Sequence, residues 1–327
     1  MSIAIAAVKS GILLGLLLTA CAYMTLLERR LLAKFQIRFG PNRVGPFGLL
    51  QPLADGIKLL FKENFVPSQA DVVVYWLAPA ISMMTALVVY AVIPFGPEVT
   101  LFGQRVPLYL ADVNVAILLV LGASSIGVYG IILGGWSSNS KYSLLGSLRS
   151  SAQLISYELA LTLAVIGVVL AAGSLSLVQI VRAQEHLWFV AIQPLGFLLF
   201  LVAALAETNR APFDLPEAEQ ELIAGYQTEY GGFKFAMFYI GEYVAIVTMS
   251  ALIVTLFWGG WNGPWLPPLL WFALKTAVFI FLFVWIRATL PRVRHDQLMA
   301  FGWKVLVPLG LLNLVVTALI VVLRGRA

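Results

Sequence analysis

The sequence contains few residues that could hold a redox centre. Among 327 residues there is one cysteine, Cys21, and there are two histidines, His186 and His295. One thiol cannot form an internal disulfide, and an iron–sulfur cluster needs about four thiolates. The histidines fall in connections that the hydropathy pattern puts on opposite sides of a membrane, so they cannot share a haem or a metal ion. Any redox chemistry linked to this chain must therefore take place on another polypeptide.

Charged residues are also scarce. They make up 11% of the chain, whereas hydrophobic residues make up 61% and the mean hydropathy is +0.92. Soluble proteins contain about 25% charged and about 45–50% apolar residues. This composition excludes a soluble globular domain and predicts an integral membrane protein of the all-α class.

Long apolar runs account for most of the chain. A membrane-spanning helix needs about 20 predominantly apolar residues, and eight stretches satisfy this requirement. We therefore expect residues 1–327 to form a single domain of eight transmembrane helices. The predicted spans are 3–27, 72–95, 113–135, 153–172, 188–206, 236–258, 268–287 and 303–323, and the odd-numbered connections are 28–71, 136–152, 207–235 and 288–302.

The positive charges are unevenly distributed around these spans. Most lysines and arginines lie in the odd-numbered connections, and few lie in the even-numbered ones or at the ends of the chain. The positive-inside rule then puts the odd connections in the cytoplasm, or in the mitochondrial matrix, and both termini on the outer side. We expect the inner membrane of a bacterium or of a mitochondrion. The basic residues follow topology, so nucleic acid is not an expected partner.

The first connection contains two recognisable segments. In "LLQPLADGIKLLFKENF" the apolar residues recur at helical spacing, with Asp55 and Lys58 off that face, which predicts a short amphipathic helix lying in the membrane interface. This helix could pack on its own bundle, or it could guide a lipid-soluble ligand. The preceding "FGPNRVGPFG" is rich in Gly and Pro and is expected to form a loop that presents Arg38, Asn42 and Arg43.

Four ionisable residues fall inside or at the end of predicted spans. Glu158, Glu242 and Lys275 lie within spans 4, 6 and 7, and Glu207 closes span 5. Charged side chains are costly within a membrane and are functional candidates for that reason. Carboxyl groups that are buried near one another could exchange protons near neutral pH. A structural ion pair, for example between Lys275 and a glutamate, is the alternative.

The stretch "AETNRAPFDLPEAEQELIAGY", residues 206–226, concentrates acidic residues in one connection. Its prolines end span 5, and Asp214 with Glu217 resembles an N-terminal capping box of a short helix over 216–226. On this helix Glu217 and Glu221 would share a face, while Glu219 would point elsewhere. A solvated acidic loop is the alternative, but the apolar residues between the acids indicate partial burial.

The basic first connection and the acidic third one are predicted to lie on the same side. They could pair and form a polar chamber at the membrane surface, because the planar guanidinium group of arginine donates hydrogen bonds to carboxylates or carbonyl oxygens. An amphipathic helix beside a lining that exchanges protons suits a lipid-soluble molecule that takes up protons. A quinone is one candidate.

Four motifs carry a resemblance that covers essentially the whole chain. They are "LLERRLLAKFQIRFGPNRVGPFGLLQPLADGIKLLFKE", "SKYSLLGSLRSSAQLISYELAL", "AETNRAPFDLPEAEQELIAGYQTEYGGFKFA" and "WIRATLPRVRHDQLM". Together they resemble the eight-helix membrane subunit of respiratory NADH:quinone oxidoreductase (complex I), the family that includes the bacterial H subunit and mitochondrial NADH dehydrogenase subunit 1.

The resemblance implies a role and a set of site residues. Members of this family join the peripheral redox arm to the membrane arm, form the membrane part of the quinone cavity and begin the charged path that couples quinone reduction to proton translocation. The quinone would be a substrate, and FMN and iron–sulfur clusters would belong to partner subunits. The residues implied near the quinone cavity are Glu28, Arg29, Arg30, Arg38, Arg210 and Arg287. Those implied on the proton path are Glu158, Glu207, Glu217, Glu219, Glu221 and Glu242.

Two other functions share some of these features. A membrane anchor of an energy-converting hydrogenase would have a related helix plan but no quinone, and the long first connection counts against it. A stand-alone ion transporter usually shows paired, broken spans in its two halves, and no such repeat is visible.

Overall fold

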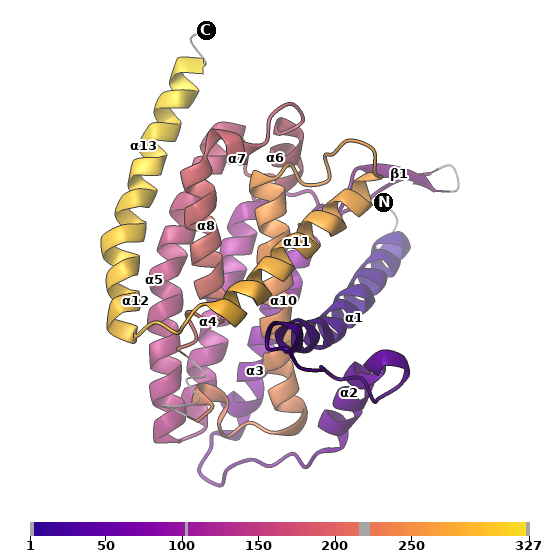
Figure 1. The fold of residues 1–327 in the computed structure, drawn as a ribbon, viewed down its shortest axis with the longest axis vertical. Helices are drawn as coiled ribbons and strands as arrows, with labels where there is room; N and C mark the ends of the chain where they lie inside the picture. The colour runs from indigo at the N-terminus through magenta and orange to yellow at the C-terminus, as the bar shows by residue number, and fades with distance from the viewer. Residues whose placement is uncertain (1–2, 102–103, 216–222, 325–327) are drawn as a thin grey trace.

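The computed structural model describes residues 3–101, 104–215 and 223–324. Within these ranges the chain is an all-α bundle with one short β-hairpin (Figure 1). Seven of the described helices are long and apolar enough to cross a membrane. They are α1 (Ile3–Phe35), α3 (Val72–Val88, extended by η2, Val89–Ala91), α4 (Ala116–Ser137), α5 (Lys141–Ala172), α10 (Gly232–Phe257), α11 (Pro268–Thr289) and the continuous run of α12 (His295–Phe301), η4 (Gly302–Leu306) and α13 (Val307–Arg324).

The fifth predicted span is shorter than expected. It is divided into α7 (Phe189–Ile192) and α8 (Pro194–Glu207). A helix of the length of α8 extends about 21 Å, less than the roughly 30 Å of a hydrocarbon core. The break lies at Gln193, whose φ of −131° and ψ of 62° are not helical. The following proline explains it, because a proline disfavours helical geometry in the residue before it.

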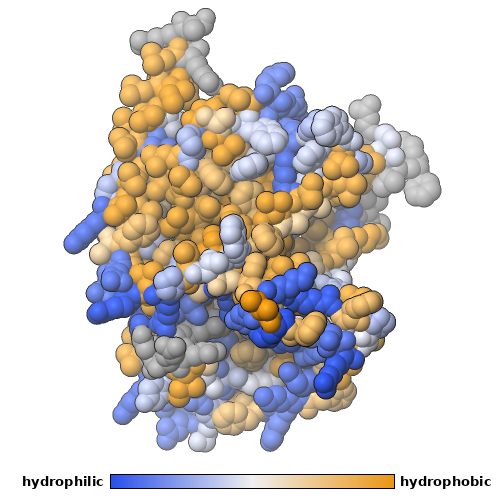
Figure 2. Space-filling view, viewed as in Figure 1, coloured by the Kyte–Doolittle hydropathy of each residue, from blue (hydrophilic) through white to orange (hydrophobic). Residues whose placement is uncertain are grey.

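Helix α10 occupies the centre of the bundle and packs against α3, α11 and α1 (Figure 1). Most of its side chains are buried. In contrast, α13 leaves Leu312, Val315 and Leu319 exposed. Figure 2 shows hydrophobic residues over α13 and the upper part of this face, whereas hydrophilic residues gather at the lower end around α2 and α12. This distribution suits a bundle surrounded by lipid with one polar end.

The polar stretch at 136–152 is not the loop that we predicted. Helix α5 begins at Lys141 and includes most of that stretch. Its small residues allow close packing: a Cβ added at Gly146 would lie 2.7 Å from the Cα of Gly225, and one added at Gly135 of α4 would lie 2.4 Å from the Cβ of Ser147. Small residues at helix interfaces let backbones approach in a membrane. The serines and glycines therefore reflect helix contacts rather than a break.

The first connection contains the predicted amphipathic helix, although α1 continues to Phe35 before the connection begins. Helix α2 spans Gln51–Phe61, has a proline in its first turn and follows the 3-10 turn η1 (Pro46–Gly48). No residue of α2 is buried, and Leu53 and Phe61 are 63% and 86% exposed. Its apolar face is thus not covered by the described bundle of this chain.

The hairpin at the other end of the molecule was not predicted. Strands β1 (Glu98–Leu101) and β2 (Gln104–Pro107) pair antiparallel, with Val99 opposite Val106. Lys9 Nζ of α1 donates to the carbonyls of Pro107 and Tyr109, at 2.7 and 2.8 Å. The helix α6 (Leu177–Ala183) and both described chain ends lie toward this same end (Figure 1).

Candidate functional site

The carboxylate of Glu28 forms the first half of a buried ion-pair network. Its Oε1 accepts from Nη1 of Arg210 at 3.3 Å and also pairs with Arg287, and its Oε2 accepts from Tyr243 Oη at 2.5 Å. Glu28 is 3% exposed. A buried carboxylate requires such partners because isolated burial of a charge is very costly. The network thus joins α1, α10, α11 and the segment after α8.

Arg210 joins this half to a second carboxylate. Its Nε pairs with Glu242 of α10, and its guanidinium lies 4.8 Å from the ring centre of Tyr243. Burial alone would lower the pKa of Arg210, but the adjacent carboxylates of Glu242 and Glu28 hold this pKa well above its ordinary value. The side chains therefore alternate in charge from Arg287 through Glu28 and Arg210 to Glu242.

The local fold after α8 explains how Arg210 reaches two acids. The helix ends at Glu207, and Asn209 takes a left-handed conformation with φ of 52°. Asparagine tolerates this conformation better than most residues. The Phe213 amide then donates to the Arg210 carbonyl at 2.9 Å, and the Val293 amide donates to the Pro212 carbonyl at 3.1 Å. Pro212, one of the two prolines that we predicted to end span 5, thus belongs to a compact turn that faces the bundle, and the other, Pro216, lies outside the described residues.

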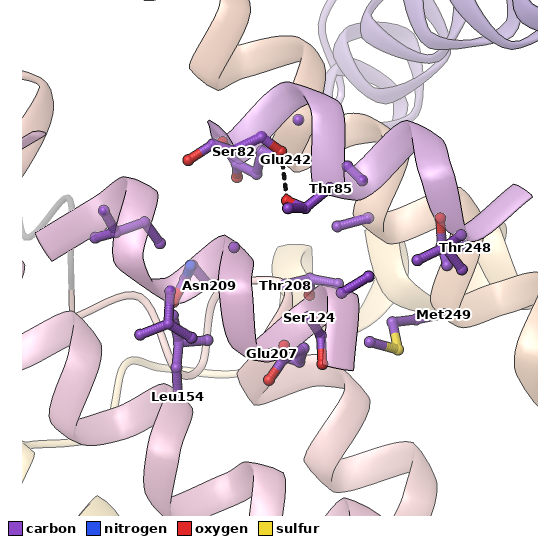
Figure 3. A pocket seen from close by; sticks show the side chains of 18 of the residues that line it. Ser82, Thr85, Ser124, Leu154, Glu207, Thr208, Asn209, Glu242, Thr248 and Met249 are labelled. Atoms are coloured by element: carbon purple, nitrogen blue, oxygen red, sulfur yellow. Dashed lines mark hydrogen bonds between the residues drawn. The ribbon is translucent and has the colours of Figure 1, made fainter. Parts of the chain in front are cut away.

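A cavity of about 120 Å³ lies next to Glu242. In Figure 3, Glu207 and Ser124 lie on one side of it, and Ser82, Thr85 and Glu242 lie on the other. Helices α3, α4 and α10 and the end of α8 supply most of its lining. The cavity therefore separates two of the glutamates that we expected on a proton path.

Polar atoms around this cavity suit water. Ser82 Oγ, Glu207 Oε2 and Asn209 Oδ1 are buried and have no hydrogen-bond partner among the residues that the structure describes. Buried polar groups are usually satisfied by protein or by ordered water. The cavity is large enough to hold more than one water molecule.

Glu158 of α5 interacts with α4 and with the end of α8. Its carboxylate accepts a hydrogen bond from Ser125 of α4, and it interacts electrostatically with Glu207. Glu158, Glu207 and Glu242 thus belong to one region of the bundle.

A second, larger cavity lies along α1. It has a volume of about 790 Å³ and lies between the C-terminal half of α1 and the loop before α2. Arg30, Lys34 and Arg38 contribute its basic lining, and the rest is mostly apolar, including Leu27 and Phe47. Glu28 belongs to the same part of α1 but joins the ion-pair network instead. We call this second cavity the α1 groove.

Arg29 forms an ion pair with helix α2. It does not line the α1 groove; its Nη1 pairs with Asp55 of α2 at 2.8 Å, and its side chain is 48% exposed. Gln51 also donates to Asp55, at 3.0 Å. Arg29 therefore connects α1 to the amphipathic helix.

Three predicted residues lie outside the described ranges. Glu217, Glu219 and Glu221 belong to residues 216–222, so the acidic helix predicted there stays a prediction. The described part of that connection contains the 3-10 turn η3 (Gly225–Gln227).

Lys275 is buried away from the ion-pair network. Its Nζ donates to the carbonyls of Trp258, Gly260 and Asn262, at 2.7, 3.2 and 2.6 Å. Its hydrogen-bond acceptors within the described ranges are thus backbone carbonyls, and the ion pair with a glutamate that we considered as an alternative is not observed there.

Two residues of the region were not predicted from the sequence. Tyr243 donates to Glu28 and packs under Arg210, and Ser125 donates to Glu158. A tyrosine directly after a glutamate within an apolar span is a usable signal for Tyr243. No comparable signal singles out Ser125. No group of three His, Cys, Asp or Glu residues in the described ranges is arranged to hold a metal ion.

Comparison with known proteins identifies the family. A family profile described as NADH dehydrogenase matches residues 8–318. The chain is 57% identical over 300 residues to the NADH-quinone oxidoreductase H subunit of Protochlamydia amoebophila, with 92% of each chain covered. It is 56% identical over 324 residues to the NADH-quinone oxidoreductase H subunit numbered 1 of Geobacter metallireducens, with 99% of this chain and 98% of that protein covered. The chain belongs to the family of NADH-quinone oxidoreductase H subunits.

The likeness to the H subunits extends over the whole region described above. The relative from Thermomicrobium roseum is 56% identical over 319 residues, with 94% of each chain covered. Residues 8–318 include α1 from Val8 onward, the α1 groove and all four members of the ion-pair network. Membership of this family confirms the resemblance on which the site residues were predicted.

Proposed function

We propose that this chain is the membrane subunit of a proton-translocating NADH:quinone oxidoreductase, in which it forms the membrane part of the quinone cavity and the start of the proton path. One observation carries the proposal: the alternating ion pairs from Arg287 to Glu242 run from α1, which also lines the α1 groove, to the cavity beside Glu207. A buried set of side chains thus connects a ligand-sized groove to a cavity that two carboxylates line.

The α1 groove suits a quinone. Ligand sites are usually concave and mostly apolar, with a few polar groups that fix orientation, and have volumes of about 300–1,000 Å³. The groove fits this description, because Leu27 and Phe47 provide apolar surface and Arg30 and Arg38 provide donors for a carbonyl oxygen. The uncovered apolar face of α2 supports access from the membrane.

The cavity of about 120 Å³ suits proton transfer. Glu207 and Glu242 both line it, and Glu158 lies close to Glu207. Proton relays in membranes use carboxylates inside the bundle, and water molecules in the cavity would bridge the two lining glutamates. We include Glu217, Glu219 and Glu221 in the same path.

The chain acts within an assembly. We place NADH oxidation, FMN and the iron–sulfur clusters in partner subunits of the peripheral arm, and we expect small membrane-arm subunits beside α13 and α5. The complex would reside in a bacterial inner membrane, or in a mitochondrial one, with both termini on the outer side. The two described chain ends lie at the same end of the bundle, which supports an even number of crossings.

The test uses membranes that contain the complete complex. Glu207→Gln, and separately Glu219→Gln, should assemble but lose most quinone-reductase activity or most of the proton gradient formed per quinone reduced. The control is Glu185→Gln, because Glu185 is exposed and lies beyond α6. Normal rates and normal gradients in both variants would refute the proton-path role.

A further inference from the structure

Helix α5 presents a fully buried amide to the segment that carries Glu207 and Arg210. Gln153 is 0% exposed, and its Nε2 donates to two backbone carbonyls, those of Ala206 and Phe213, each at 2.8 Å. Carbonyl oxygens only accept hydrogen bonds, so both bonds require the NH₂ group of this side chain. Gln153 thus holds the two ends of residues 206–213 together.

The residues between these two carbonyls are functional ones. Glu207 lines the cavity of about 120 Å³, and Arg210 pairs with Glu28 and Glu242. The carbonyl of Ala206 belongs to the last turn of α8, where carbonyls lack an intrahelical partner. It also accepts from the Asn209 amide, at 3.3 Å. The shape of this turn, and with it the directions of both charged side chains, depends on the bonds that fix its ends.

A neighbouring residue of α5 contacts the same turn. Tyr157, one helical turn after Gln153, has its ring centre 5.6 Å from that of Phe213 and donates to the Leu298 carbonyl at 3.0 Å. The Val293 amide, from the connection before α12, donates to the Pro212 carbonyl. The turn is therefore fixed on one side by Gln153 and on the other by the connection between α11 and α12.

We infer that Gln153 is a positioning residue for quinone-coupled proton transfer, and that it acts by holding residues 206–213 so that Glu207 faces the cavity while Arg210 reaches both acids. The inference rests on the proposed function and adds to it a residue that lines neither the α1 groove nor the smaller cavity. The side chain of Gln153 is uncharged, so it takes up no proton itself and contributes only by holding the turn in place.

The chain offers a matched control for this inference. Gln184 is also 0% exposed, and its Nε2 also donates to two carbonyls, those of Ile180 and Thr255, at 3.2 and 2.9 Å. It lies at the hairpin end of the bundle, next to α6, away from the ion-pair network. Replacing either glutamine by methionine removes the donors and keeps a similar volume. Gln184→Met also removes the Oε1 acceptor of the Phe189 and Gly259 amides, so it disturbs more local bonds than Gln153→Met and is a stringent control for a merely structural effect.

The experiment compares Gln153→Met with Gln184→Met in membranes that contain the complete complex. Assembled complex is quantified by NADH oxidation with a water-soluble acceptor, and kcat and KM are then measured with a quinone per assembled complex. We expect Gln153→Met to lower kcat at least tenfold with KM changed by less than about threefold, and Gln184→Met to leave both within twofold. The double variant Gln153→Met/Glu207→Gln should be no slower than Glu207→Gln alone, since both changes disable one step.

Specific results would overturn the inference. A normal kcat for Gln153→Met would overturn it. A double variant Gln153→Met/Glu207→Gln whose fold-loss in kcat equals the product of the two single fold-losses would also overturn it. If Gln153→Met does not assemble, Gln153→Asn is used instead, because it keeps the NH₂ group but is one methylene too short to reach both carbonyls. The same fall in kcat supports the inference, whereas normal kcat or failed assembly of this variant also overturns it. If Glu207→Gln itself behaves normally, the proposed proton path fails instead.

Discussion

Glu28 of α1 and Arg287 of α11 are 259 positions apart in the chain and form an ion pair inside the bundle. The pair connects the C-terminal parts of these two helices. Arg287 is 28% exposed in its side chain, whereas Glu28 is 4% exposed. The pair thus extends from the buried centre of the network toward its accessible edge.

Replacing Glu28 by glutamine should strongly impair the complex. The change leaves Arg287 without this carboxylate and leaves Arg210 with Glu242 alone. Removing one partner of a buried pair typically costs about 3–5 kcal/mol. We expect the quinone-reductase rate per assembled complex to fall at least tenfold, measured with NADH and a quinone in membranes.

The control for Glu28→Gln is Asp296→Asn. Asp296 pairs with Arg294 at 3.2 Å, but both side chains are exposed, at 66% and 80%. Exposed pairs contribute about 0–1 kcal/mol, so the rate should stay within twofold. Equal effects of the two substitutions would show that burial of the Glu28 network is unimportant.

Arg210→Lys tests whether the network depends on geometry as well as on charge. Two different nitrogens of Arg210, Nη1 and Nε, contact Glu28 and Glu242. A lysine keeps the positive charge but has one compact ammonium group instead of a planar fork. We expect an assembled complex whose quinone-reductase rate and proton gradient are both reduced at least tenfold. A lysine variant with normal coupling would mean that charge alone is sufficient at this position.

Leu27→Trp should obstruct the α1 groove. Leu27 lines the groove, and a larger ring there would reduce the space for a ligand. We expect KM for a long-chain quinone to rise at least fivefold, with a smaller change in kcat, in steady-state kinetics of the purified complex. Leu18→Trp is the control, because Leu18 is also an exposed leucine of α1, at 43%, and is not part of the groove lining. Parallel changes in both variants would argue against a ligand in the groove.

Lys275→Met should affect stability and not coupling. Lys275 Nζ bonds three carbonyls and lies 4.4 Å from the ring centre of Trp188. Hydrogen bonds to charged groups contribute about 1.5–3 kcal/mol each, so the variant should lose a few kcal/mol of local stability. We expect a lower thermal midpoint for the detergent-solubilised complex and an unchanged quinone-reductase rate per assembled complex. A specific loss of proton translocation would instead place Lys275 on a proton path.

The fold could be predicted largely from hydropathy, with errors at particular places. Apolar runs identified the long helices, and helical spacing identified α2. The start of α5 was missed because its serines and glycines read as a polar loop, although they serve close helix packing. The hairpin around Val99 and Val106 was missed because its two four-residue strands lack a distinct pattern.

The site was predictable as a set of residues, but its connections were not. Glu242 was expected to act because charge inside an apolar span is costly, whereas Glu28, Arg210 and Arg287 were expected only because the motifs around them resemble a known family. Which acid pairs with which base depends on helix packing between residues up to 259 positions apart. Gln153 carries no charge, so its role could be recognised only from the two carbonyls that it contacts.

The balance of positive and negative charges in the ion-pair network makes it responsive to protonation. Arg287, Glu28, Arg210 and Glu242 contribute two positive and two negative charges, so the set as a whole is neutral. A proton gained by either glutamate leaves one uncompensated positive charge in a poorly polarisable interior, where charges interact over longer distances than in water. The neutrality of the set thus makes it sensitive to the arrival of a single proton at either glutamate.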